Sequence, residues 1–384
     1  MNKHGLGLIG CGGRLRSVVQ NLINATDEVE VVALHDPNPS SIEKSLEKFN
    51  PSATLHNSVE ALVNDPRVEW VMIGSWNCQH AEHALAAFKA GKHVFCEKPL
   101  ALSIEDCLAM RKAWKESGQH FTIGFTLRYS PHYRRIKEIL SEGTIGDIIS
   151  MEFNETLAFN HGGYIHADWR RKTEWAGTHL LEKCCHDIDI VNWMVDSSVS
   201  KAASFGGCDF FTLENEHHVD RVGKNDKGKE AFKTWNHSEI EGNILNPFND
   251  DKDILDNQVA IVEFANGVRS TFHTNCNCAI PERRLYICGT EGTLRSDVID
   301  GKIEVKRIGF ETELEDMGTD AKGGHGGGDG VLGKSLAQTI LKGTPSLTSL
   351  DDGLKAAFTA FGIDEAQKTG KVVDLDAMWK KAGL

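Results

Sequence analysis

Lys98, Glu182 and His186 are the residues whose types and spacing best fit proton-transfer chemistry. Glu182 and His186 are four positions apart in a stretch with helical apolar spacing, which predicts that they share one face of a helix. A carboxylate beside an imidazole orients it and raises its pKa, so the histidine becomes a base near neutral pH. Lys98 lies in the step Glu97-Lys98-Pro99, directly after an apolar run. Taken alone, each feature is more often a surface ion pair, so the elements around them decide.

A glycine-rich turn comes much earlier in the chain and predicts a nucleotide cradle. An apolar run over residues 6–9 leads into it, and helical spacing follows. Gly10 permits a tight turn, while Gly12 and Gly13 let the backbone approach a pyrophosphate at the helix N-terminus. Leu15 stands where the usual fingerprint has a small residue, so the helix is expected slightly farther from the strand. The predicted cofactor residues of this turn are Gly10, Gly12, Gly13, Arg14 and Leu15.

Asp36 ends the next apolar stretch, Val29 to His35. A carboxylate at this point accepts hydrogen bonds from the adenosine ribose and repels a 2′-phosphate. Pro37 follows where a phosphate-binding arginine would otherwise stand. The sequence therefore predicts NAD in preference to NADP. The alternative is that Asp36 only caps a turn.

Strands and helices alternate through residues 1–125, which predicts an N-terminal Rossmann domain with a doubly wound parallel sheet. The pattern then changes to longer alternating strands, including a strong hairpin turn at Asn266-Gly267. Residues 126–384 are therefore predicted to form a C-terminal α+β domain. Its sheet is expected to be large, open and mostly antiparallel. The polar stretch 223–256 has no period and is predicted to be a long excursion.

Several of these segments together resemble the glucose–fructose oxidoreductase/inositol dehydrogenase/rhizopine-catabolism (Gfo/Idh/MocA) family. The segments are the glycine turn, Asp36, Ser75-Trp76-Asn77 with His80, Glu97-Lys98-Pro99 and Arg128-Tyr129. The resemblance covers nearly the whole chain. It implies that Lys98 lies beside the nicotinamide and the reacting hydroxyl group. The family also carries an acid and a histidine four residues apart; the acid is commonly aspartate and here is Glu182.

The resemblance implies two sets of site residues besides the catalytic Lys98, Glu182 and His186. The further cofactor residues are Ser75, Trp76, Asn77, His80, Glu97, Lys98 and Arg128. The substrate residues are Lys98, Trp169, Arg170, Glu182, Lys183, His186 and His325. Lys183 is predicted to pair with Asp187, unless a rotated helix brings it into the pocket. The glycine-rich stretch 323–329 either brings His325 and Asp329 over a sugar or is a connector with Asp329 as N-cap.

The implied activity is NAD-dependent oxidation of a secondary hydroxyl group of a sugar, sugar derivative or cyclitol. One alternative uses the same site for redox-assisted glycoside cleavage or epimerisation with recycled NAD. A second alternative is a non-catalytic sugar sensor on the same fold. The resemblance also implies a homodimer or homotetramer formed through the C-terminal sheet.

Composition limits the other function classes. The net charge is −13 without a basic block, so no nucleic-acid or anionic-membrane partner is predicted. The sequence contains no apolar run of about 18 residues and no leader-like start, so a cytoplasmic protein is expected. Ten cysteines then indicate reduced thiols. Zinc-type spacings are missing from the sequence, and no metal is predicted.

Overall fold

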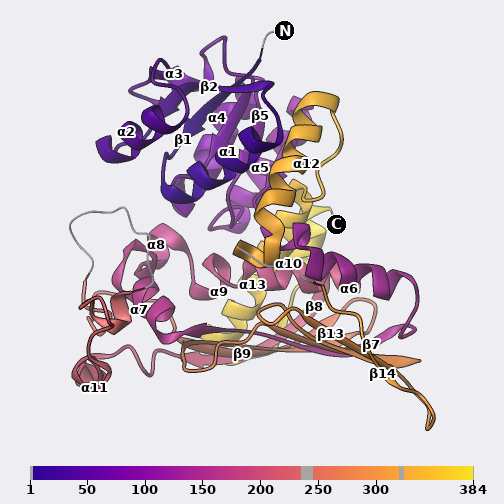
Figure 1. Cartoon of the computed structure of the whole chain (residues 1–384). Helices are drawn as coiled ribbons and strands as arrows, with labels where there is room; N and C mark the ends of the chain where they lie inside the picture. The colour runs from indigo at the N-terminus through magenta and orange to yellow at the C-terminus, as the bar shows by residue number, and fades with distance from the viewer. Residues whose placement is uncertain (1–2, 235–244, 320–323, 384) are drawn as a thin grey trace. The chain divides into compact units, whose positions relative to one another are not determined.

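The chain folds into two compact units in a computed structural model that describes residues 3–234, 245–319 and 324–383 (Figure 1). The first unit comprises Met1–Ser130 and Gly327–Ala357, and the second comprises Pro131–Gly326 and Phe358–Leu384. The predicted division after residue 125 lies close to the first change of unit. It does not provide for the return of residues 327–357 to the first unit. Of the helices described, none combines the length and the apolar character that a membrane crossing requires.

The first unit is built on a six-stranded parallel sheet of order β3-β2-β1-β4-β5-β6. Its strands are β1 (His4–Ile9), β2 (Val29–His35), β3 (Thr54–Leu55), β4 (Trp70–Ile73), β5 (His93–Cys96) and β6 (Phe121–Ile123). This order confirms the predicted doubly wound sheet. The strand order reverses between β1 and β4, where such sheets bind nucleotides at their carboxyl ends.

Capping explains where the helices of this unit begin. The helices are α1 (Gly13–Ala25), α2 (Pro39–Lys48), α3 (Val59–Val63), α4 (His80–Lys89), α5 (Ile104–Ser117) and α12 (Gly328–Lys342). Ser58 and Ser103 accept hydrogen bonds from the backbone N–H groups of Ala61 and Asp106, so they are N-caps of α3 and α5.

Helix α12 returns from the far end of the chain to pack against α1. A side chain at Gly333 would collide with the backbone of Asn21, so the two helices approach closely there. Leu332 and Leu336 are buried in the same core as Leu15. The sequence pattern gave no sign that this helix belongs to the first unit.

The second unit carries a nine-stranded sheet of order β14-β13-β12-β11-β7-β10-β9-β8-β15. Its strands are β7 (Ile148–Ala158), β8 (Val199–Gly207), β9 (Asn257–Phe264), β10 (Arg269–Cys278), β11 (Arg284–Gly289), β12 (Gly292–Asp297), β13 (Lys302–Arg307), β14 (Leu314–Asp316) and β15 (Val373–Asp374). The β7–β10 pair is parallel and the other pairs are antiparallel. This confirms the predicted mostly antiparallel sheet. Gly267 (φ 87°) lies in the predicted hairpin turn between β9 and β10.

The two faces of this sheet differ. Helices α6 (Pro131–Ser141) and α10 (Cys185–Val195) cover one face, as Figure 1 shows. Along β9, Ala260 and Val262 are buried on that side, while Val259 and Ile261 alternate with them and are exposed. Period-two alternation of this kind is expected when one face of a sheet is packed and the other is open.

The polar excursion is anchored by aromatic side chains. Phe232 and Phe248 are buried against Phe211 in a separate small core. Asp256 accepts hydrogen bonds from the backbone N–H groups of Phe210 and Phe211 and so closes the base of the excursion. Residues 235–244 of the predicted stretch 223–256 lie outside the described residues.

Candidate active site

The glycine turn of the first unit has the geometry of a phosphate cradle. Gly10 has φ 80°, and a Cβ there would lie 2.4 Å from the backbone nitrogen of Ser75, so glycine is required. Gly12 is the N-cap of α1 without a side-chain cap bond, and a Cβ on it would meet no atom within 4 Å. The first turn of α1 therefore offers its N–H groups beside open space. These features fit the pyrophosphate of a dinucleotide.

Leu15 is accommodated by a neighbouring glycine, so the expected displacement of the helix is unnecessary. Its side chain is fully buried in the core of the first unit. A Cβ on Gly74 would lie 2.6 Å from the Cβ of Leu15, so Gly74 provides the room that a small residue at position 15 usually supplies. The side chain of Leu15 therefore packs in the core. The predicted contact of Leu15 with the cofactor is then one of its backbone atoms.

Asp36 ties the end of β2 to the glycine turn. Its carboxylate accepts hydrogen bonds from the backbone N–H groups of Cys11 (2.5 Å) and Asn38 (2.7 Å). The turn contact that the sequence offered as an alternative is therefore present. The same carboxylate fixes the glycine turn, and its contact with a ribose remains a prediction.

Arg14 connects three elements of the first unit. Its guanidinium donates to Glu97 (2.8 Å), Asp329 (2.6 Å) and Thr126 (2.7 Å). Glu97 is buried, and its second oxygen lies 3.4 Å from the backbone nitrogen of Lys98, to which it is a weak acceptor. Helix α12 has Gly327 as its N-cap, so the alternative of Asp329 as N-cap is wrong. The carboxylate of Asp329 instead neutralises Arg14.

His80 holds the ends of two strand segments together. Its ring is completely buried, with Nδ1 2.8 Å from the carbonyl oxygen of Pro99 and Nε2 3.2 Å from that of Ser75. The Lys98–Pro99 peptide bond is cis. The two hydrogen-bond contacts of the His80 ring favour a positioning role for this residue over direct contact with a cofactor. His83, which the sequence analysis did not single out, lies 2.9 Å from the hydroxyl oxygen of Ser75.

The other predicted cofactor residues lie in two places. Trp76 is 40% exposed and Asn77 is buried, in the turn that follows β4. Arg128 is buried and forms an ion pair with Asp352 (3.0 Å), so its charge is used within the first unit. Lys98 is half-buried and comes two residues after the end of β5.

The predicted helix around Glu182 and His186 is in fact two helices. α9 (His179–Glu182) ends before Lys183, and α10 begins at Cys185. Thr178 caps α9, and Cys184 is the N-cap of α10. The prediction that one continuous helix face carries Glu182 and His186 is therefore wrong. Lys183 lies at the break, as the C-cap of α9.

Glu182 is held by Arg170 and the side chains around it (Asp168, Trp169 and Tyr164), a cluster called here the arginine cage. Its carboxylate accepts a hydrogen bond from Arg170 (3.1 Å), which also pairs with Asp168 (2.6 Å). The guanidinium carbon of Arg170 lies 4.5 Å from the ring centre of Trp169 and 5.5 Å from that of Tyr164. Burial raises the pKa of Asp168, against the effect of Arg170. Asp168 and Glu182 thus share one cation.

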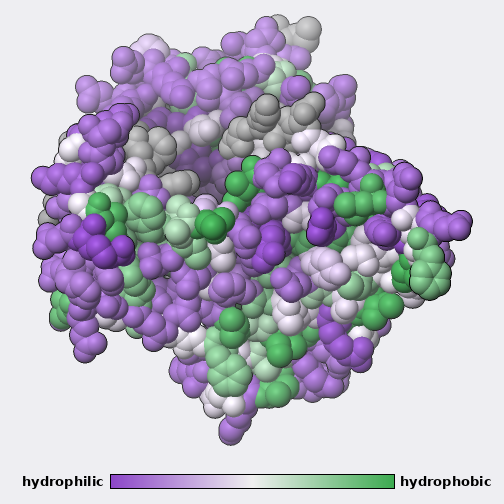
Figure 2. All heavy atoms as spheres, turned by 60° about the horizontal axis from the view of Figure 1, so that its bottom comes forward, coloured by the Kyte–Doolittle hydropathy of each residue, from purple (hydrophilic) through white to green (hydrophobic). Residues whose placement is uncertain are grey.

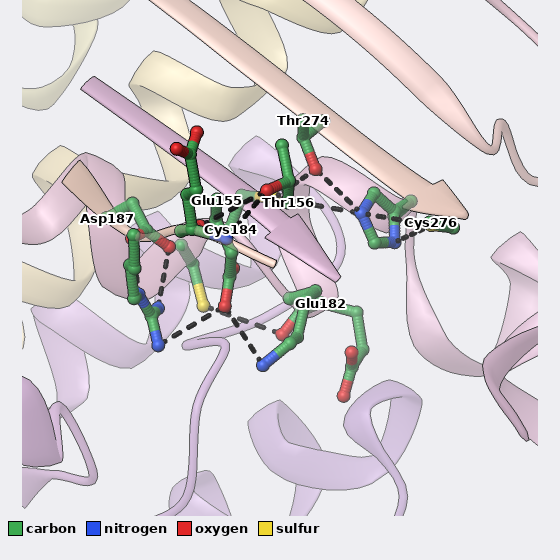
Figure 3. A network of polar contacts seen from close by, with 12 residues as sticks. Glu155, Thr156, Glu182, Cys184, Asp187, Thr274 and Cys276 are labelled. Atoms are coloured by element: carbon green, nitrogen blue, oxygen red, sulfur yellow. Dashed lines mark hydrogen bonds and ion pairs between the residues drawn. The ribbon is translucent and has the colours of Figure 1, made fainter. Parts of the chain in front are cut away.

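A second network of buried ion pairs lies in the same unit (Figure 3). Glu155 accepts from Lys183 (3.1 Å) and Arg283 (3.2 Å), and Arg283 binds both carboxylate oxygens of Asp187 at 2.7 Å. The predicted Lys183–Asp187 pair is therefore wrong, because each residue has another buried partner. Burial favours neutral Glu155, but Arg283 and Lys183 bring its pKa below the usual range. Burial raises the pKa of Asp187 to about 7, although Arg283 opposes this.

Imidazole rings gather in the same unit. His186 is buried, and the centre of its ring lies 5.7 Å from that of His325. His325 has a positive φ of 51°, uncommon for a residue other than glycine. Burial and the charge of Lys183 lower the pKa of His161 to about 2, so this ring stays neutral. The structure therefore brings together His186 and His325, as the sequence had proposed for the substrate pocket.

His179 lies among thiols and a hydroxyl group that sequence reasoning did not connect with it. Its Nε2 is 3.2 Å from the hydroxyl oxygen of Thr274, 3.8 Å from the sulfur of Cys184 and 3.6 Å from that of Cys276 (Figure 3). Burial raises the pKa of both thiols well above the usual value. Among the described residues, no group of three or more His, Cys, Asp and Glu is arranged to hold a metal ion.

Comparison with known proteins gives matches along most of the chain. Residues 5–125 match the profile described as the Gfo/Idh/MocA oxidoreductase family, NAD-binding Rossmann fold. Residues 137–375 match the profile of that family's C-terminal alpha/beta domain. Levoglucosan dehydrogenase, solved in complex with NADH and levoglucosan, superimposes with a TM-score of 0.78 over 97% of this chain and 100% of that chain. At 21% identity this likeness establishes the fold alone.

Two curated proteins are similar at higher identity. Inositol 2-dehydrogenase of Gluconacetobacter diazotrophicus is 34% identical over 202 residues, covering 52% of this chain and 56% of that protein. 2,7-Anhydro-N-acetylneuraminate hydratase of Escherichia coli is 31% identical over 202 residues, covering 52% of each. The chain thus spans about half the length of the curated relatives that it matches.

Proposed function

Because the chain belongs to the Gfo/Idh/MocA oxidoreductase family, we propose that it is an NAD-dependent dehydrogenase of a sugar, sugar derivative or cyclitol. The observation that carries this proposal is the buried His186 in the same unit as a caged carboxylate, Glu182. The similarity to inositol 2-dehydrogenase supports the same substrate class. A polyol suits a pocket rich in hydrogen-bonding side chains.

Each residue has a proposed role in the oxidation of a secondary alcohol. His186 accepts the hydroxyl proton, and Lys98 donates a hydrogen bond to the oxygen as negative charge develops on it. Bound NAD supplies the acceptor for the hydride that leaves the same carbon. Glu182, fixed by Arg170, accepts a hydrogen bond from His186 or from a neighbouring substrate hydroxyl group.

We propose NAD rather than NADP as the cofactor. Asp36 places a carboxylate at the end of β2, where a ribose 2′-hydroxyl is a better partner than a 2′-phosphate. An Asp36→Ala variant should therefore lose affinity for NADH. The difference between its affinities for NADH and NADPH should become smaller. Fluorescence titration with both dinucleotides measures this difference directly.

Replacing Lys98 by alanine tests the catalytic proposal. The variant should lose turnover with every accepted polyol by at least about a hundredfold, because the developing alkoxide loses its donor. NADH affinity, measured by fluorescence, should change little. Lys89→Ala, at the end of α4, is the matched control for loss of one lysine. Turnover of Lys98→Ala at the wild-type rate would rule out the proposed role.

A second candidate uses the same site for a transient oxidation within another reaction. The similarity to 2,7-anhydro-N-acetylneuraminate hydratase supports this second candidate. In that case NAD is regenerated in each cycle, so a substrate is converted without NADH accumulating in solution. Following product by chromatography and NADH by absorbance in one reaction separates the two candidates.

We further propose that a second copy of this chain covers the open face of the nine-stranded sheet. Phe205 is exposed there on β8, Val259 and Ile261 on the neighbouring strand β9, and Tyr286 on β11 farther across the sheet. Figure 2, which turns this side forward, shows hydrophobic side chains among polar ones on the surface. A face of this kind is self-complementary in a two-fold dimer. A cytoplasmic location of the protein is likewise proposed.

A further inference from the structure

The carboxylate of Glu182 is carried by a helix of a single turn. Helix α9 begins at His179 and ends at Glu182, and its N-cap is Thr178. The hydroxyl oxygen of Thr178 accepts a hydrogen bond from the backbone N–H group of Leu181 (3.1 Å), and its carbonyl oxygen accepts one from that of Glu182 (2.9 Å). A helix this short is marginal without outside support, so the position of Glu182 depends on what holds Thr178.

Support for Thr178 comes from a residue near the end of the chain. Asp364 lies on α13 (Leu350–Thr369), and both residues belong to the second unit. The hydroxyl group of Thr178 donates to the carboxylate of Asp364 at 2.6 Å, a distance typical of a hydroxyl group bound to an ionised carboxylate. A hydroxyl group has one proton to donate and two lone pairs that accept. Because the proton is directed to Asp364, the lone pairs remain available for the N–H group of Leu181.

The carboxylate of Asp364 also accepts from a second donor. Gln258, a buried residue of β9, donates through its amide nitrogen to the other carboxylate oxygen (3.4 Å) and to the hydroxyl oxygen of Ser204 (3.1 Å). The hydroxyl proton of Ser204 goes to the carbonyl oxygen of Val259 (2.9 Å), so the amide group of Gln258 cannot turn round. Two donors from two different elements therefore face Asp364.

An ionised carboxylate fits this position because it only accepts hydrogen bonds. Burial raises the pKa of Asp364 to about 6, although the hydrogen bonds from Thr178 and Gln258 oppose this, so the group is mostly ionised at pH 7.5. Asparagine has the same shape but presents one oxygen and one NH2 group. In an Asp364→Asn variant, one of the two donors would therefore face another donor.

We propose that Asp364 is a positioning residue of the site, which fixes α9 through Thr178 and with it the carboxylate of Glu182. The proposed role rests on the dehydrogenase function, because Glu182 takes part in that reaction. Arg170 holds the side chain of Glu182, whereas Asp364 acts on the backbone of α9 through its N-cap. The effects of the two residues are therefore separable by experiment.

Hydrogen exchange of backbone amides tests this anchor without any assay of activity. The amides that report on the cap are those of Leu181 and Glu182, followed by mass spectrometry of the folded, full-length protein at pH 7.5. Asp364→Asn and Thr178→Val should each speed their exchange by about tenfold or more, as expected for the loss of an N-cap. Thr178→Ser keeps the hydroxyl group and should behave like the wild type. Unchanged exchange in either of the first two variants, when folded, would overturn the proposal.

A matched control is available on the same helix. Glu365 is the next residue of α13, and its carboxylate is exposed. Glu365→Gln makes the same change of charge and should leave the exchange of the α9 amides at the wild-type rate. Faster exchange in this variant as well would assign the effect to α13 as a whole and overturn the role of Asp364.

Turnover then tests whether the anchor serves Glu182. Asp364→Asn should lower kcat for an accepted polyol by about tenfold through misplacement of Glu182, with smaller changes in KM and NADH affinity. In a Glu182→Gln background the same substitution should cost no further kcat, since both act through one group, although it should still speed amide exchange. A full further loss of kcat in that background would overturn the role in positioning Glu182.

The two measurements distinguish failure of the anchor from failure of the dehydrogenase function. A wild type that oxidises no polyol, together with faster exchange in Asp364→Asn and Thr178→Val, would remove the dehydrogenase function and leave the anchor of α9 in place. A lower kcat in Asp364→Asn without faster exchange would overturn the anchor and leave the dehydrogenase function in place.

Discussion

At the scale of single residues, the arginine cage decides the direction of Glu182. Arginine presents a planar fork that lysine lacks, so it can serve Asp168 and Glu182 at once. Arg170→Lys should keep the charge but lose the bridge, and kcat should fall by roughly tenfold or more through misplacement of Glu182. NADH affinity and the KM for an accepted polyol should change less than kcat.

The neighbouring arginine provides the control for this prediction. Arg171→Lys changes a side chain whose carboxylate partner is Asp251 (2.8 Å) rather than Glu182, and it should retain the wild-type kcat. Adding Glu182→Gln to Arg170→Lys should cost little more than either change alone, since both act through one contact. Fully additive losses would mean that Arg170 acts independently of Glu182.

Residue types were easier to predict than residue partners. The sequence singled out Glu182, His186, Lys183 and Arg170, and all four lie in the second unit. Its pairings were wrong for Lys183, because the partner Glu155 is on β7 and far away in the sequence. Burial of one charged side chain against another depends on sheet register, which periodicity along a single segment does not contain.

At the scale of elements, the glycine turn and the start of α1 form the cradle of the first unit. A Cβ on Gly12 meets no atom of the protein, whereas one on Gly10 would collide with the backbone of Ser75. Gly12→Ala should therefore fold with an unchanged melting temperature and lose NADH affinity by about tenfold or more, since the methyl group takes space meant for pyrophosphate. Gly10→Ala should lose both stability and binding.

Thermal unfolding and fluorescence titration of the two variants distinguish these effects. Gly91→Ala, at an exposed turn with φ 68°, is the control for a glycine-to-alanine change away from the cradle. It should lower stability modestly and leave NADH affinity intact. Normal NADH affinity in Gly12→Ala would mean that the pyrophosphate does not approach this turn.

The elements show where local reasoning ends. The type of both sheets was predictable from apolar runs and alternation, and β2 matches its predicted limits. The break between α9 and α10 was not predictable, because the hydrophobic pattern continues unbroken across Lys183. Thr178 can nevertheless cap a short helix before the break. The pairing of α12 with α1 was equally hidden, since it joins opposite ends of the chain.

At the scale of the whole molecule, buried histidines make stability sensitive to acid. Burial lowers the pKa of His83, His132 and His179 to about 4 and that of His166 to about 3. In the unfolded chain these rings titrate near 6.5, so between pH 6.5 and 4 the unfolded state binds more protons. The contribution of these histidines to the free energy of unfolding should therefore fall as the pH is lowered through this range, by about 2 kcal/mol per histidine at pH 5, whereas the raised pKa of Asp187 acts in the opposite direction.

Denaturant unfolding at pH 7.5 and pH 5 measures this loss. His166 stacks on Phe211 with ring centres 4.6 Å apart, and its ring nitrogens have no hydrogen-bond partner among the described residues. His166→Phe keeps the stacking and removes one titrating group, so the difference between the two pH values should shrink. His217→Gln alters an exposed histidine and should leave the difference in the free energy of unfolding between the two pH values unchanged. A pH difference that His166→Phe leaves intact would assign the acid sensitivity to other groups.

The open sheet face leads to a prediction about assembly. Ile261 lies at 60% exposure between Ala203 and Thr271 on the neighbouring strands, so a charge there would project from the middle of the face. Ile261→Asp should convert the proposed dimer to monomer, because a desolvated carboxylate at the centre of an apolar interface has no partner.

Sedimentation of the wild type and the variant over a range of concentrations tests this assembly. Phe310→Asp, which changes a fully exposed phenylalanine in the turn after β13, is the control and should leave the mass unchanged. The variant monomer should remain folded by circular dichroism, since Ile261 contributes little to the core. A wild type that is monomeric at all concentrations would contradict the proposed dimer. A dimer that tolerates Ile261→Asp would mean that its interface is not this sheet face. The exposed row of Phe205, Val259 and Ile261 would then require a different occupant.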